Sequence, residues 1–208
     1  LEQPMAAAIG ADLPINEPVG NLVIDIGGGT TETAVISLGG IVALEAVRVG
    51  SFDIDAAIQS YVRREHGLAI GERTAEEIKI SIGSAMATPE DRDAEVRGRD
   101  LVSGLPKTVV LTSSEIRVAI DDVVTQMVNS VIRCLASAPP ELSQDFLTRG
   151  MYLVGGGSML RGLARRIERD TQVPVNMSTE PLEAVVLGAG HCVENFAALR
   201  GLFMDSRR

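Results

Sequence analysis

The sequence has no tryptophan and is poor in other aromatic residues, histidine and cysteine. Its 208 residues include four phenylalanines, two tyrosines, two histidines and two cysteines, so the core must be aliphatic. His66 and His191 are isolated in the sequence, which argues against a catalytic histidine pair. Cys134 and Cys192 form neither a CxxC motif nor a metal-ligand spacing. We expect both to be buried free thiols, as in a reducing cytoplasm.

Positive charge and long apolar segments are also lacking. The formal net charge is −9, which argues against a nucleic-acid-binding surface because phosphate contacts need clustered lysine and arginine. One arginine cluster has acidic neighbours, and we predict that it forms a solvated helix face: Arg161, Arg165, Arg166 and Arg169. No apolar run approaches the length that spans a bilayer, and the first residues do not resemble a signal peptide.

The most informative feature is a glycine triplet, Gly27-Gly28-Gly29, between two predicted strands. Asp25 lies at the end of the first strand, and Thr30 follows the triplet. Glycine lets a backbone turn approach a ligand closely, and successive exposed N–H groups form a concavity for phosphate oxygens. No lysine follows as in a P-loop, and the triplet leads into a strand and not into a dinucleotide-binding helix. The alternative is an ordinary hairpin turn.

A second triplet, Gly155-Gly156-Gly157, follows the apolar residues 151–154. Apolar residues at helical spacing predict a helix over 159–170, so we expect this loop to lie at a helix N-terminus. Flat glycine backbone can also lie against a purine. The alternative is close strand–helix packing without a ligand. Two such units in a small chain favour a nucleotide site, and we expect the triplets to converge on one side of a single sheet.

The remaining pattern predicts an α/β fold of the ribonuclease-H-like type. We expect a mixed five-stranded sheet with helices in residues 1–67 and 112–208, and a small inserted α+β subdomain in residues 68–111. The expected strands are 22–26, 32–38, 41–49, 94–101, 108–111, 151–154 and 173–177. The expected helices are 4–9, 52–66, 75–84 and 159–170, a long one that begins with a capping box at Thr112, and 181–199 with an interruption at 188–190.

Several segments resemble one family. They are residues 2–10, 25–32, 35–42, 61–64, 95–99, 139–142 and 155–163. In these segments the chain resembles the C-terminal half of the MreB/Mbl-type bacterial actin homologues, the rod shape-determining proteins. The glycine loops fit any actin-like ATPase, whereas Pro-Met-Ala-Ala-Ala-Ile-Gly (4–10) and Glu-Val-Arg-Gly-Arg (95–99) narrow the match to MreB-like proteins. Nearly the whole first half of the family has no counterpart, so we interpret the chain as a fragment or an isolated domain.

The resemblance implies roles for individual residues. The phosphate-binding loop would be Gly27, Gly28, Gly29 and Thr30, and Asp25 would hold Mg²⁺ through water. Nucleoside contacts would come from Glu76, Lys79, Gly155, Gly156, Gly157 and Met159. Glu76 and Lys79 could instead form a surface i,i+3 salt bridge. Gln3 stands where the family usually has a glutamate that positions or activates water; a glutamine can orient water but cannot take its proton. Alternatively, Gln3 is the frayed start of a truncated helix.

The resemblance also implies a function. The intact protein would bind ATP and Mg²⁺, hydrolyse ATP slowly and form filaments that set rod cell shape by organising cell-wall synthesis. Its partners would be further copies of itself and a membrane-embedded adaptor of the cell-elongation machinery, with no nucleic acid and no membrane segment in this chain. It would be cytoplasmic, and its filaments would be membrane-associated. We expect this chain alone to be inactive, because donors that stabilise developing charge are missing. The alternatives are a heat-shock-chaperone-type ATPase domain and a nucleotide-free interaction module.

Overall fold

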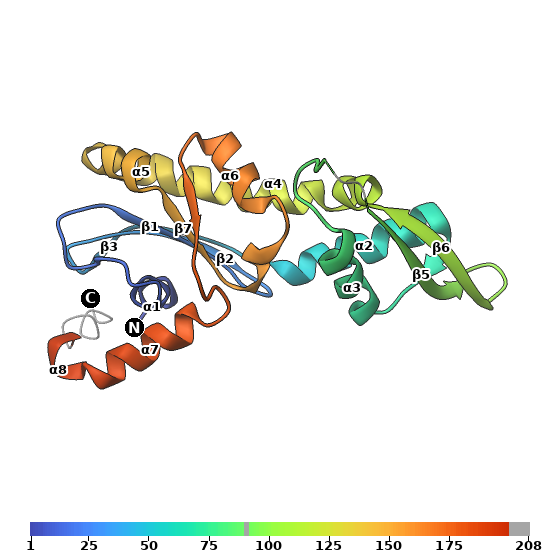
Figure 1. Cartoon of the computed structure of the whole chain (residues 1–208), viewed down its shortest axis with the longest axis horizontal. Coiled ribbons are helices and arrows are strands. Elements are labelled where there is room, and N and C mark those ends of the chain that lie inside the picture. Colours follow the sequence, from blue (N-terminus) through green and yellow to red (C-terminus); the bar gives the residue numbers. More distant parts are fainter. Residues whose placement is uncertain (90–91, 200–208) are drawn as a thin grey trace.

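The computed structural model describes residues 1–89 and 92–199, which contain two β-sheets (Figure 1). The larger sheet has five strands in the order β3-β2-β1-β7-β8. Its strands are β1 (Asn21–Ile26), β2 (Thr31–Ser37), β3 (Gly40–Val47), β7 (Met151–Val154) and β8 (Val175–Met177). β1, β2 and β3 pair antiparallel, whereas β7 pairs parallel with β1 and with β8. The predicted mixed five-stranded sheet is therefore confirmed.

Helices cover both faces of this sheet (Figure 1). The helices of the described chain are α1 (Gln3–Gly10), α2 (Ser51–His66), α3 (Glu72–Ile82), α4 (Ser113–Ser137), α5 (Ser143–Arg149), α6 (Leu163–Thr171), α7 (Ala184–Glu194) and α8 (Phe196–Leu199), with short 3-10 turns η1 (Pro140–Leu142) and η2 (Gly156–Met159). Of these, α2 and α3 lie beside the smaller sheet. No helix within the described ranges is long and apolar enough to cross a membrane. Sequence reasoning missed α5, a short helix whose buried residue is Phe146.

The smaller sheet has the order β4-β5-β6 and lies beside α3. Its strands are β4 (Leu68–Ala69), β5 (Asp93–Asp100) and β6 (Pro106–Thr112). This sheet supports our division of the chain into a core and an inserted segment, which remains a proposal. The predicted start of α3 is wrong, because the helix begins at Glu72 after Gly71. The residue before the predicted start, Thr74, therefore lies inside the first turn and not at the N-cap.

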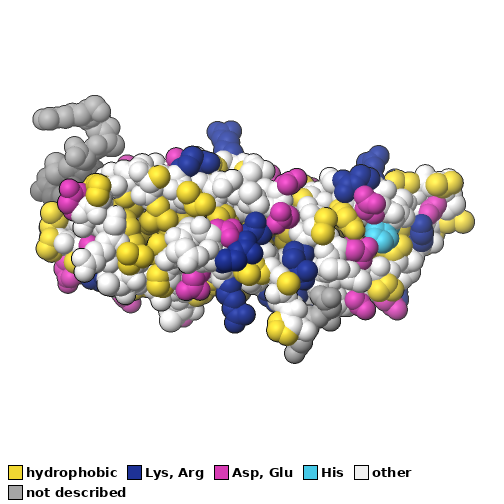
Figure 2. All heavy atoms as spheres, turned by 90° about the horizontal axis from the view of Figure 1, so that it is seen from above, with side chains coloured by type: hydrophobic (Ala, Val, Ile, Leu, Met, Phe, Trp, Pro, Cys, Tyr) yellow, Lys and Arg dark blue, Asp and Glu magenta, His cyan; other side chains and the backbone are white. Residues whose placement is uncertain are grey.

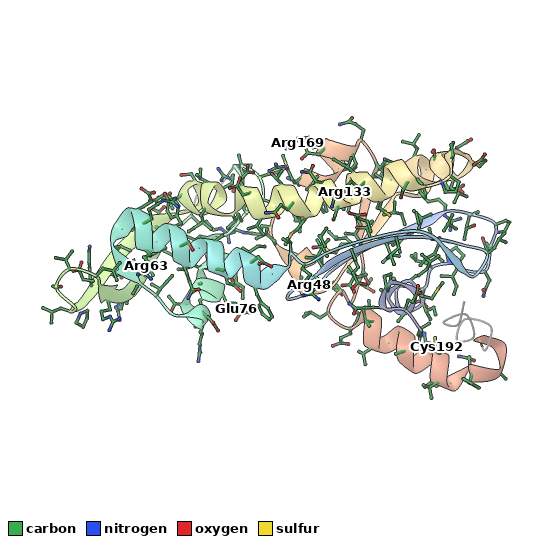
Figure 3. The ribbon with its side chains drawn as sticks, turned by 180° about the vertical axis from the view of Figure 1, so that it is seen from behind. Arg48, Arg63, Glu76, Arg133, Arg169 and Cys192 are labelled. Atoms are coloured by element: carbon green, nitrogen blue, oxygen red, sulfur yellow. The ribbon has the colours of Figure 1, made fainter. Side chains whose placement is uncertain are left out.

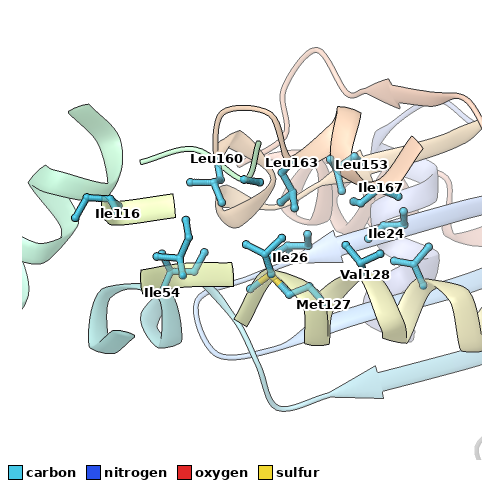
Figure 4. Packing of buried hydrophobic residues seen from close by; sticks show 14 of the residues in the cluster. Ile24, Ile26, Ile54, Ile116, Met127, Val128, Leu153, Leu160, Leu163 and Ile167 are labelled. Carbon is cyan, nitrogen blue, oxygen red and sulfur yellow. The ribbon is translucent and has the colours of Figure 1, made fainter. Parts of the chain in front are cut away.

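The main core lies between the larger sheet, α2, α4 and α6 (Figure 4). It is aliphatic, as the scarcity of aromatic residues requires, and its members include Ile24, Ile26, Ile54, Ile116, Met127, Leu153, Leu160, Leu163 and Ile167. The capping box at the start of α4 is confirmed, since Glu115 N donates to Thr112 Oγ1 and Thr112 N donates to Glu115 Oε2. Cys134 and Cys192 are buried and free, as expected. Burial raises the pKa of the Cys134 thiol to about 11.

The prediction of a solvated face is confirmed for Arg165 and Arg169, which are exposed, but it is wrong for Arg166. Arg166 binds Asp121 and Thr125 of α4, as well as Asp170 on its own helix, and its side chain is only 14% exposed. It therefore connects two helices across the outer layer. On the face of the molecule that carries α4 and α6, acidic side chains lie among the basic ones (Figure 2).

On the opposite face of the sheet, α1 and α7 pack closely against each other. The predicted interruption at 188–190 is wrong, because α7 continues through these residues. A Cβ at Gly10 would overlap the carbonyl oxygen of Ala184, and one at Gly188 would overlap the carbonyl oxygen of Ala6. Both glycines therefore permit helix–helix contact and do not break a helix.

Gly188→Ala is expected to destabilise the chain by about 1–3 kcal/mol, because the added methyl group forces α7 away from α1. Gly190→Ala is the matched control, since a Cβ there meets nothing within 4 Å. The control is expected to be neutral or to stabilise by up to about 1 kcal/mol through helix propensity. Urea unfolding of both variants measures this. Equal free energies of unfolding would contradict the role assigned to Gly188.

Candidate functional site

The first glycine loop joins β1 to β2 and lies on the beginning of α2. Gly27 N donates to Thr30 O at 2.9 Å, which closes the turn. The loop carbonyls of Gly27 and Gly28 accept hydrogen bonds from Ser51 N at 3.0 Å and Phe52 N at 2.8 Å. These are N–H groups of the first helical turn, which have no partner within their own helix. The loop is therefore fixed in position by α2.

The other backbone N–H groups of the loop indicate that it binds a ligand. Among the described residues, the N–H groups of Gly28, Gly29 and Thr30 donate to no protein acceptor. A Cβ at Gly29 would meet nothing within 4 Å, so this part of the loop faces open space. Successive free amides suit an anion such as a phosphate group. Gly27 differs from the expectation, because its N–H is already used inside the turn.

Asp25 lies at the end of β1, where its neighbours bury it. The residue is 3% exposed, and its Oδ2 accepts a hydrogen bond of 2.8 Å from Gln3 Nε2. Burial raises the pKa of Asp25, and the hydrogen bond from Gln3 opposes this rise. Burial and the charge of Asp25 also raise the pKa of Glu32, its partner on β2. Gln3 and Asp25, predicted for separate roles, are therefore in direct contact.

The second glycine loop lies against the end of β1. Gly155 has a φ of +84°, and a Cβ there would stand 2.5 Å from Asp25 Oδ1 and overlap the Ile26 backbone. Gly157 lies similarly against Ile26. The expectation that this loop starts a helix is wrong, because it continues into the 3-10 turn η2 and α6 begins only at Leu163. The argument from a helix dipole therefore does not apply to this loop.

Both glycine loops contribute to one pocket of about 450 Å³. The predicted residues that line it are Gly28, Glu76, Lys79, Gly156, Gly157 and Met159. Glu76 comes from α3, which packs on α2 (Figure 3). The expected convergence of the two triplets is thus confirmed. The other predicted residues are not among the lining residues and lie in the loops beside it or at the ends of α1 and β1: Gln3, Asp25, Gly27, Gly29, Thr30 and Gly155.

The pocket also has an apolar rim. Phe52, Ile80, Met159 and Leu182 line the pocket, and each is more than half exposed, with Phe52 at 69%. Exposed apolar side chains that gather around a pocket are typical of a ligand-binding site. These apolar side chains suit a flat aromatic group of a ligand, whereas the free backbone amides of the first loop suit an anionic group.

Lys79 does not form the surface salt bridge with Glu76 that was the alternative to a binding role. Its Nζ donates to Ser51 Oγ at 2.7 Å and to Asp55 Oδ2 at 2.9 Å, and it lies 3.4 Å from the Ser51 carbonyl oxygen. Within the described chain its ion-pair partner is Asp55 of α2, so the structure does not show the i,i+3 pair with Glu76. Burial raises the pKa of Asp55, and the contact with Lys79 opposes this rise.

Sequence reasoning missed the contribution of α2 to the site. Ser51, Phe52 and Ile54 line the pocket, and Asp55 holds Lys79. The sequence contained one signal, which is the glycine at position 50, directly before the helix. In the structure, Asp53 Oδ2 accepts a hydrogen bond from Gly50 N at 2.8 Å. A Cβ at Gly50 would overlap the Gly28 carbonyl oxygen, which explains the glycine. A glycine just before a helix can indicate backbone contact with a loop that is distant in sequence.

The five-stranded sheet and the paired glycine loops define one half of an actin-like fold. Crystal structures of MreB5 of Spiroplasma citri superpose on the chain with a TM-score of 0.91. The match to the ADP-bound form has 35% identity and covers 98% of this chain and 61% of that chain. The match to the AMPPNP-bound form has 36% identity and covers 96% of this chain and 60% of that chain. The family model for MreB/Mbl protein matches residues 1–201. The chain belongs to the MreB/Mbl family.

Curated relatives agree with this assignment. The cell shape-determining protein MreB of Escherichia coli (strain K12) is 50% identical over 194 residues, which are 93% of this chain and 56% of the relative. The cell shape-determining protein Mbl of Bacillus subtilis (strain 168) is 41% identical over 198 residues, at 95% and 60%. The chain therefore spans less than two thirds of the length of these relatives.

Asp25→Asn is expected to change how stability depends on pH. Because burial raises the pKa of Asp25, the folded state binds more protons than the unfolded state above the ordinary value of 3.8. The wild-type chain therefore loses stability from Asp25 as pH rises from about 3.8 through the raised pKa. Asparagine has no charge to bury and removes this loss.

Urea unfolding from pH 4 to pH 7 measures this effect as the difference between the variant and the wild type. The difference should shift in favour of Asp25→Asn as pH rises and then level off. The pKa of Glu32 should fall in the variant, which acts in the same direction. A difference that does not vary with pH would contradict the burial cost assigned to Asp25.

Proposed function

We propose that this chain forms one wall of an ATP-binding cleft in a filament-forming protein of the MreB type. The observation that carries the proposal is the pocket itself, in which both glycine triplets meet Glu76 and Lys79 from α3. The MreB5 structures bound to ADP and AMPPNP support a nucleotide as the ligand.

The phosphate groups would lie over the first glycine loop. The free N–H groups of Gly28, Gly29 and Thr30 would donate to phosphate oxygens, and the glycines leave room for close approach. Mg²⁺ is commonly held by one or two carboxylates, phosphate oxygens and several waters. Asp25 fits such a site through water, since Oδ2 is bound to Gln3 while Oδ1 accepts no hydrogen bond from the described residues.

The nucleoside would lie at the other end of the pocket. Gly156, Gly157 and Met159 offer a surface with little side-chain bulk below the apolar rim, while Glu76 and Lys79 supply an acceptor and a donor for hydroxyl or ring atoms. Gly155 would act indirectly, because its contact with Asp25 and Ile26 holds the turn in place.

Hydrolysis would need groups that this chain does not contribute. Gln3 Nε2 is bound to Asp25, so its Oε1 remains to orient a water molecule, without acting as a base. The chain spans 56% of the E. coli relative, and residues outside it would supply the second wall of the cleft and its donors. The chain alone is therefore expected to bind nucleotide weakly and to hydrolyse none.

The cellular role follows the family. The whole protein would assemble into filaments in the cytoplasm and set cell shape by organising cell-wall synthesis, with residues 68–111 in contact with the next subunit. Filaments would associate with the membrane through an embedded adaptor. The two curated relatives, both cell shape-determining proteins, support this role.

Gly156→Val tests the nucleotide site. The new side chain would occupy pocket space beside Leu182, whereas the φ at this position does not require glycine. We expect the dissociation constant for Mg-ADP to rise at least about tenfold, because the valine collides with the bound nucleoside. Isothermal titration or NMR titration at millimolar ADP measures it.

Gly71→Val is the matched control. Gly71 is an extended residue before α3, a Cβ there meets nothing within 4 Å, and it does not line the pocket. The control should bind Mg-ADP as the wild type does. Identical titrations for wild type and Gly156→Val would remove the nucleotide from this pocket.

A further inference from the structure

Lys79 lines the proposed nucleotide pocket, and its ammonium group is bound by residues of α2. Its side chain is 11% exposed, and that of Asp55 is 10% exposed. Two of the three N–H groups of Lys79 are well used, at 2.7 Å to Ser51 Oγ and 2.9 Å to Asp55 Oδ2. The third is directed at the Ser51 carbonyl oxygen at 3.4 Å, which is long for a hydrogen bond. A ligand acceptor can take over this third N–H at little cost.

Asp55 has a feature that a purely structural ion pair would avoid. Its Oδ1 is buried and has no hydrogen-bond partner among the described residues, although the residue is only 7% exposed. An unsatisfied buried carboxylate oxygen destabilises the folded state, and burial raises the pKa of this group. The placement of this carboxylate is explained by its other oxygen, Oδ2, which accepts the hydrogen bond from Lys79.

Ser51 connects the same cluster to the first glycine loop. Its side chain accepts from Lys79, and its backbone N–H donates to the Gly27 carbonyl oxygen at 3.0 Å. The ammonium group of Lys79 is thus fixed relative to the loop proposed to hold phosphate, although Lys79 lies on α3 and the loop lies between β1 and β2.

We propose that Asp55 is a positioning residue that acts through Lys79. Together with Ser51 it fixes the ammonium group at the pocket wall, so that the third N–H of Lys79 is directed at the nucleoside end of a bound nucleotide. This inference rests on the proposed function. It assigns a role to a side chain that does not line the pocket and that sequence reasoning did not select.

A double-mutant cycle on the 208-residue chain tests it, with Asp55→Asn, Lys79→Met and the double variant. Mg-ADP is the probe, and NMR titration gives the dissociation constant. Each single variant should raise the constant about tenfold, because each removes the directed charge-assisted donor. The double variant should bind no more weakly than Lys79→Met alone, because Asp55 has no effect without Lys79.

Glu77→Gln is the control, since it also neutralises a carboxylate, two residues before Lys79 in the sequence, but this carboxylate is exposed on α3 and paired with Arg73. It should bind as the wild type does. Thermal unfolding reports whether each variant folds. Should Asp55→Asn fail to fold, Asp55→Glu takes its place in the cycle, because it keeps the buried charge and moves the carboxylate that holds Lys79. A weaker affinity in Asp55→Glu that is absent in the Lys79→Met background then supports the proposal, and wild-type affinity in Asp55→Glu overturns it.

Wild-type affinity in Asp55→Asn or in Lys79→Met overturns the inference, and so do losses that add up in the double variant. These results leave the proposed nucleotide site standing if the wild type binds Mg-ADP and Gly156→Val binds it more weakly, as predicted above. Absence of binding by the wild-type chain at millimolar ADP overturns both proposals.

Discussion

The site depends on the close contact between the second glycine loop and the end of β1. Gly155 and Gly157 lie so near Ile26 and Asp25 that no larger residue fits without movement of the backbone. Because β7 pairs parallel with β1, their following loops leave the sheet at the same edge. Glycine in the second loop then allows this loop to lie directly beside the first. The pocket forms because these two strands pair and because the glycines of the second loop carry no side chains.

The second constraint is the attachment of the first loop to α2. Two N–H groups at the start of this helix satisfy the carbonyls of Gly27 and Gly28, which leaves the neighbouring amides of the loop available. Lys79 extends this rigid unit to α3 through Ser51 and Asp55. At the pocket, α3 is thereby connected to α2 and to the first loop by polar contacts, while residues of both sheets share the aliphatic core.

Much of the fold could be predicted because local patterns and global packing agree. The strands around Asp25, the capping box at Thr112 and both glycine loops are visible as short-range patterns. Other features depend on long-range contacts: Gly188 and Gly50 are glycines because a distant backbone lies against them. Asp55 could not be selected either, since only the fold brings Lys79 to it. Sequence periodicity reports which face is buried, but not which distant group touches it.

The most direct test of the account is an NMR titration of the isotope-labelled chain with Mg-ADP, followed at the backbone amides. Gly28 and Gly29 belong to one loop, and Gly156 and Gly157 belong to the other. The account predicts that the amide signals of both loops shift along one common binding curve. Shifts confined to one loop, or separate curves for the two loops, would contradict a single site built from both.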